Sequence, residues 1–67
     1  MKLYDRVEFV ADAPDIGVSK GMVGTLVDIN EGRHGYELAI ELSDDDSEMD
    51  LMRYVTSDRL EILRVVD

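Results

Sequence analysis

The feature that most constrains this chain is an alternation of apolar and polar residues with a period of two. It is clearest over residues 36–42, where every second position is apolar: Tyr36, Leu38, Ile40 and Leu42. Glu37 and Glu41 occupy the opposite side. A strand places successive side chains on opposite faces, whereas a helix would scatter these residues around its surface. The pattern therefore predicts a β-strand with one buried face.

A second strand is predicted directly after a glycine-rich turn. Gly17, Gly21 and Gly24 precede it, and glycine adopts the positive φ values of sharp turns without a Cβ clash. The alternate positions that follow are β-branched: Thr25, Val27 and Ile29. They predict a half-buried strand over residues 23–30, with this side apolar and the side of Leu26 mixed. We also expect Gly24 to let a neighbouring strand pass close by, as at a barrel corner.

Two strands are predicted nearer the ends of the chain. In residues 6–11, Val7, Phe9 and Ala11 share one side, and Leu3 extends this set. Pro14 ends that strand because it cannot donate to a ladder. A closing strand follows at residues 61–66, and residues 57–60 before it predict a single turn capped by a hydroxyl of Ser57 or Thr56.

A less regular strand is predicted over residues 51–56. We expect Met52 and Tyr54 to be partly buried and Arg53 to point outward, although a slip of one residue would exchange the two faces. Residues 31–35 contain two glycines between alternating runs, which predicts a hairpin loop of about three to five residues. Ile16 or Val18 is expected to close the open end of the core.

The predicted fold is all-β: one domain over residues 1–67, built as a small, strongly bent, five-stranded antiparallel SH3-like barrel. A 3-10 turn precedes its last strand. Closing a sheet on itself removes exposed edges, which matters where no helix covers them. An OB-fold is the alternative, but it usually carries a helix between its third and fourth strands, where residues 43–50 predict a turn.

The net charge of −9 is large for a chain of 67 residues. The negative field of such a charge repels nucleic-acid backbones and attracts basic partners. The bland alternative is that the charge only keeps the protein soluble. Cysteine is absent, so no disulfide or cysteine-ligated zinc can staple the fold. The N-terminal residues have no continuous apolar run, and no segment reaches the about 20 apolar residues that span a bilayer. A soluble, cytoplasmic protein without membrane contact is expected.

Four short motifs spread over nearly the whole chain are most distinctive: Leu3-Tyr4-Asp5, Lys20-Gly21 with Val23-Gly24-Thr25, Gly35-Tyr36-Glu37, and Asp58-Arg59-Leu60. Their spacing resembles a family of small bacterial proteins catalogued as domain of unknown function 4926. The element from Gly21 to Gly24 is also similar to the KOW turn of SH3-like ribosomal and transcription-factor domains. The resemblance implies an SH3-like fold and no established activity. By analogy, not by residue match, such proteins are reminiscent of antitoxin or immunity partners.

An acidic run is the strongest candidate for a partner-binding surface. Its carboxylates are Asp44, Asp45, Asp46, Glu48 and Asp50. Alternate acids resemble the opening of a calcium loop, but the glycine and glutamate required at its sixth and twelfth positions are Met49 and Val55. The run therefore predicts a solvated hairpin tip or a docking surface for a basic partner, with weak calcium binding as the least favoured alternative and no dedicated metal site.

Catalytic chemistry finds little support in the sequence. His34 is the only histidine and lies in a predicted turn, and the serines lack a paired base. Neither phosphate-binding glycine motif is present. We therefore expect no enzyme, no catalytic residue and no cofactor.

Three functions remain open. The preferred one is a protein-interaction module, with an antitoxin-like or immunity-like partner of a basic protein as its sharper form. A nucleic-acid-associated KOW-like barrel is the alternative, but its cations are scattered: Lys20, Arg33, Arg53, Arg59 and Arg64. Tyr36 and Tyr54 are expected in the core or at its rim, not as stacking platforms. An accessory subunit would instead expose an apolar rim of Ile16, Val18, Met22 and Met52. The oligomeric state stays open, with the third or last strand as a candidate edge.

Overall fold

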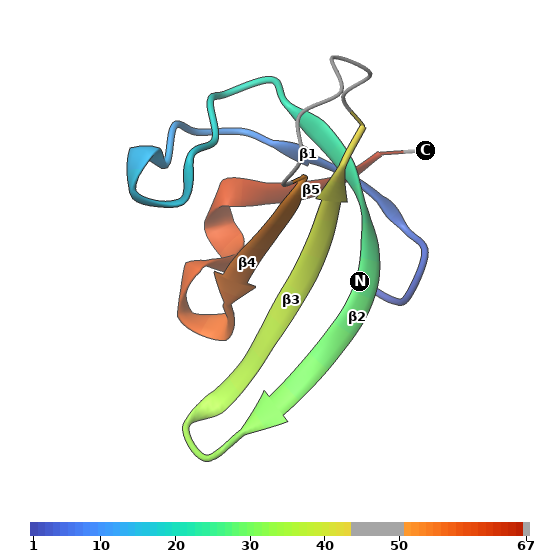
Figure 1. Cartoon of the computed structure of the whole chain (residues 1–67), viewed down its shortest axis with the longest axis vertical. Helices are drawn as coiled ribbons and strands as arrows, with labels where there is room; N and C mark the ends of the chain where they lie inside the picture. Colours follow the sequence, from blue (N-terminus) through green and yellow to red (C-terminus); the bar gives the residue numbers. More distant parts are fainter. Residues whose placement is uncertain (44–50, 67) are drawn as a thin grey trace.

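A computed structural model describes residues 1–43 and 51–66 (Figure 1). Its five strands form one antiparallel sheet in the order β4-β3-β2-β1-β5. The strands are β1 (Arg6–Phe9), β2 (Val23–Gly32), β3 (Gly35–Leu42), β4 (Met52–Thr56) and β5 (Leu63–Val66). Two 3-10 turns accompany them: η1 (Pro14–Ile16) and η2 (Ser57–Ile62). The all-β prediction and the 3-10 turn before the last strand are confirmed. Over the described residues the sheet is not closed, because no ladder joins β4 to β5.

The hairpin of β2 and β3 is the longest element and extends past the rest of the molecule (Figure 1). Its ladder continues as far as the pair Gly32 and Gly35. Only Arg33 and His34 form the turn, so the predicted loop of three to five residues is too long. Gly35 has φ of +128°, a value that side-chain-bearing residues rarely adopt. The strands are longer than predicted because glycine allows pairing to continue to the tip.

The buried side of β2 differs from the prediction. Leu26 is completely buried, whereas Ile29 is 36% exposed. A β-bulge between Leu26 and Asp28 adds Val27 to the strand, so that Ile29 pairs with Leu38. Because paired residues share a face, the bulge moves Ile29 to the same side as Leu26. The β-branched alternation of the sequence therefore does not mark the core face.

The core is a cluster of apolar side chains between the bent sheet and its connections. Its largest completely buried members are Phe9, Leu26, Ile40, Val7 and Val55. Burying a side chain of this size contributes about 1.5–3 kcal/mol to folding. Leu38 and Leu42 are also buried, which confirms the predicted inward side of residues 36–42. Val18 is buried and Ile16 packs against the cluster, in agreement with the predicted closure of the core.

The first strand is shorter than expected. β1 ends at Phe9, and Ala11 lies outside it while still packing against the core. Leu3 was expected to extend the inward side but is 44% exposed. The chain turns before β1, because Tyr4 has φ of +71° and the amide of Asp5 donates to the carbonyl of Lys2. This turn directs Leu3 away from the inward side of β1.

The predicted orientation of residues 51–56 is wrong by one residue. Arg53 pairs with the buried Ile40 and therefore lies on the core side of β4, where it is half-buried. Tyr54 pairs with Ala39 on the other side and is 48% exposed. The long apolar stem of arginine can cover core atoms, which lets a charged residue occupy this position on the strand. The last strand begins at Leu63, not at residue 61, because η2 continues through the preceding residue.

Gly24 is the point at which strands approach most closely. It is buried and pairs with Val7 on one side and Leu42 on the other. A Cβ placed there would lie 2.7 Å from the carbonyl oxygen of Glu41 and 2.8 Å from Cγ2 of Ile40. These distances confirm the expected close approach and explain why the position is glycine.

The substitution Gly24→Ala should destabilise the protein by about 1–3 kcal/mol, because the added methyl group must push apart two paired strands. Gly32→Ala is the matched control in the same strand, since its Cβ would meet the carbonyl of Gly35 at an ordinary 3.5 Å. The control should change the free energy of unfolding by about 0.5 kcal/mol or less. Urea unfolding of both variants measures the difference, and equal destabilisation would show that the contact at Gly24 is unimportant.

Candidate functional site

An open groove of about 550 Å³ lies where the far end of the hairpin meets the start of η2. The residues that line it are Asn30, Glu31, Gly32, His34, Gly35, Tyr36, Glu37, Thr56, Ser57 and Asp58. They come from both strands of the hairpin, from the end of β4 and from η2. The groove exists because β4 leaves the sheet at Thr56, its pair with Glu37, while the hairpin continues.

Ser57 fixes η2 against the start of β3. Its Oγ accepts a hydrogen bond from the amide of Tyr36 at 3.3 Å. A Cβ on Gly35 would collide with this Oγ, so the close seating of η2 requires glycine at that position. The predicted capping of η2 is wrong, because neither hydroxyl bonds to the backbone of the turn. The hydroxyl of Thr56 donates to Oδ1 of Asp58 at 2.5 Å instead.

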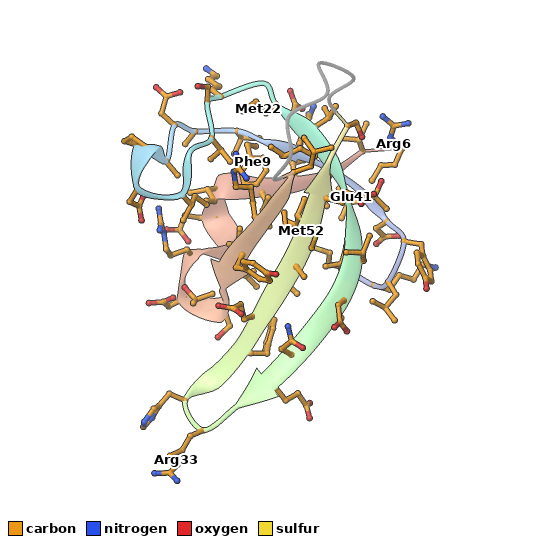
Figure 2. All side chains as sticks on the ribbon, viewed as in Figure 1. Arg6, Phe9, Met22, Arg33, Glu41 and Met52 are labelled. Carbon is orange, nitrogen blue, oxygen red and sulfur yellow. The ribbon has the colours of Figure 1, made fainter. Side chains whose placement is uncertain are left out.

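The lining of the groove is acidic. It includes three acidic residues, Glu31, Glu37 and Asp58, and no lysine or arginine among the described residues. Glu31 pairs with Tyr36 and Glu37 pairs with Asn30, so the two glutamate side chains leave the hairpin on opposite faces. Arg33 is adjacent in sequence, but its side chain extends from the tip of the hairpin away from the molecule (Figure 2). The groove is therefore a region of negative potential on a protein that is already strongly acidic.

The acidic side chains of the described residues do not cluster in the way that a metal site requires. Within residues 1–43 and 51–66, no three histidine, aspartate or glutamate side chains come together closely enough to hold a metal ion. The three groove carboxylates come from three different segments, the end of β2, the start of β3 and η2. His34 lies in the hairpin turn, as predicted, and lines the groove.

An ion pair ties η2 to the connection between β1 and β2. Nη1 and Nη2 of Arg59 donate to Oδ2 and Oδ1 of Asp15 at 2.7 and 3.2 Å. The hydrogen bonds from Arg59, together with its positive charge, lower the pKa of Asp15 below the usual 3.8. Because η2 carries Ser57 and Asp58, this two-point contact also supports one wall of the groove.

The pair predicts a specific pH dependence of stability. Since the folded pKa of Asp15 is below the unfolded value, its contribution is complete above about pH 4–5 and is lost as the pH falls through the folded pKa. Asp15→Asn should slightly lower the free energy of unfolding at neutral pH and have a smaller effect at about pH 2, because protonation of Asp15 removes the ion pair as the pH falls. Urea titrations at both pH values test this, with Glu41→Gln as an exposed control. A loss that persists at low pH would contradict the ionic origin.

The acidic run predicted as a partner surface, Asp44, Asp45, Asp46, Glu48 and Asp50, lies outside the described residues. Two other predictions concern the tyrosines and an apolar rim. Tyr36 and Tyr54 are 40% and 48% exposed and are not in the core. Of the apolar rim expected of an accessory subunit, Val18 is buried, whereas Ile16, Met22 and Met52 are only partly buried.

The cations do not gather on one face. Arg59 pairs with Asp15, and Arg64 pairs with Glu8 across β1 and β5. Arg6 and Arg33 lie at opposite ends of the molecule (Figure 2). A nucleic-acid surface would concentrate such residues, so this distribution does not favour that alternative.

No local sequence pattern predicts the groove directly. One signal was present: the alternation over residues 36–42 is longer than the run at 51–56 that pairs with it. A strand longer than its neighbour leaves its last residues unsupported on that side. The part of β3 that extends beyond β4 contains Tyr36, which lines the groove.

Comparison with known proteins supplies no relative: no family model, curated protein or solved structure matches this chain. Among residues 1–43 and 51–66, no helix combines the length and apolar character needed to cross a bilayer.

Proposed function

We propose that this protein is a small, non-enzymatic interaction module that binds a basic segment of a partner protein in the groove between the β2–β3 hairpin and η2. The observation that carries the proposal is the lining of that groove, which has three carboxylates and no lysine or arginine among the described residues. The net charge of −9 adds a long-range field of the same sign.

The charge and the concave shape of the groove favour binding of a basic segment. A concave surface of one charge sign concentrates counter-charged ligands and raises their association rate. The carboxylates of Glu31 and Glu37 stand on paired strands, so their backbone is already ordered before a partner arrives. The interaction should weaken with added salt, because exposed charges are screened over about 10 Å at 0.1 M.

We also propose a specific class of fold for this chain, an SH3-like barrel. Strands β1 to β4 form a meander, β5 returns to pair with β1, and η2 directly precedes β5. This order supports an SH3-like barrel, and we propose membership of the family catalogued as domain of unknown function 4926 from the resemblance of the sequence motifs alone. Within that class we favour an antitoxin-like or immunity-like role in the cytoplasm, in which the acidic surface masks a basic site.

The test measures binding of a short peptide rich in lysine and arginine by fluorescence anisotropy. The double variant Glu31→Gln/Glu37→Gln should weaken binding about three- to tenfold, because two exposed attractive charges are lost from the groove. Glu41→Gln/Glu61→Gln is the matched control. It makes the same change in net charge at exposed positions outside the groove and should change affinity less than about twofold.

Two outcomes would contradict the groove. Equal weakening by both double variants would show that only net charge matters. Weakening by Asp44→Asn/Asp46→Asn, with no effect of the groove variant, would place the contact on the acidic run instead. A complex unaffected by ionic strength would exclude the electrostatic basis altogether.

A further inference from the structure

The groove is lined by an aromatic residue, Tyr36, and by an acidic residue, Glu31, that pairs with it across the hairpin. Tyr36 lies on the same side of β3 as the buried Leu38 and Ile40, but beyond the core, and it is 40% exposed. Glu31 is its direct partner across the ladder and is also exposed. Directly opposed residues point to one face with Cβ atoms about 4.5–5.5 Å apart. The two side chains therefore leave the hairpin on the same face, from neighbouring positions.

We propose that Tyr36 and Glu31 make the groove selective for arginine over lysine in the basic partner; this inference rests on the function proposed above. A guanidinium is planar, so it can lie on the face of an aromatic ring while its N–H groups donate to a neighbouring carboxylate. An ammonium is a compact, strongly hydrated charge and lacks the flat surface and the forked donors. Lysine therefore gains the charge attraction without the stacking contribution.

The backbone of the pair is held in place before binding. The amide of Tyr36 is fixed by Oγ of Ser57 at 3.3 Å, and the next ladder pair, Gly32 and Gly35, closes the hairpin beside it. Glu37 follows Tyr36 in β3 and so points to the opposite face, where it adds charge without sharing the same guanidinium. These positions assign the direct carboxylate contact to Glu31.

The chain offers a matched control for the ring. Tyr54 is exposed to a similar extent, 48%, but pairs with Ala39 and so lies on the other side of the sheet from Leu38. It does not line the groove. Replacing either tyrosine with leucine removes an exposed ring from a strand while leaving the charge unchanged.

The experiment compares two peptides of equal length and charge, one with arginine and one with lysine at every basic position. The unaltered protein should bind the arginine peptide about two- to fivefold more tightly, the size of an exposed cation–π contact. Tyr36→Leu should abolish this preference, Tyr36→Phe should keep it, and Tyr54→Leu should leave it unchanged. Circular dichroism melting of each variant verifies that the fold is retained.

The results separate the two proposals. Equal binding of both peptides by the unaltered protein, weakened by salt and by the groove charge variants, would overturn arginine selectivity and leave the proposed function standing. Failure of both peptides to bind would overturn both. A preference that survives Tyr36→Leu, or is lost in Tyr54→Leu, would also overturn the assignment of the ring.

Discussion

The pairing of β2 with β3 is the interaction on which the rest of the structure depends. The ladders of β1 on β2 and of β4 on β3 are built on the outer edges of this pair, and β5 pairs in turn with β1. Only the ladder of β2 and β3 runs the full length of the molecule, from Gly24 and Leu42 to Gly32 and Gly35. Because β1 and β4 are much shorter, they support one end of the hairpin and leave the other end open. The core occupies the supported end and the groove occupies the open end.

This division lets a small protein carry many charges without placing them in its core. Among the described residues, no polar or charged residue falls in the buried class. Burying an ionised group costs several kcal/mol unless it is paired, which a domain of this size could not easily offset. The groove carboxylates remain near water at the open end, where their desolvation cost is small until a partner covers them. The cationic partner proposed above would compensate that cost with its own charge.

The sequence predicted the regular parts of this arrangement and missed those set by tertiary context. Alternation identified the core face of β3 because that strand is regular and pairs on both sides. It failed in β2, where Gly24 and Leu26 face the core before the bulge and Ile29 lies on that side after it, so no single alternation runs through the strand. No residue type marks such a bulge. It failed at Arg53 because an edge strand accepts a charged residue on its core side when the stem packs. The groove depends on where β4 stops relative to the hairpin, a relation between segments that local patterns do not contain.

The distribution of arginines strengthens the argument for the groove as the contact surface. The chain has sixteen acidic and seven basic side chains. Each positive charge reduces the negative potential mainly in its own surroundings. Arg59 and Arg64 are held by Asp15 and Glu8, and Arg33 extends away from the tip. None of these three residues lines the groove, although Arg59 lies near enough to Asp58 to interact with its charge. Charge and concavity coincide in the groove with an exposed aromatic ring, and the binding of a basic partner proposed above rests on this combination.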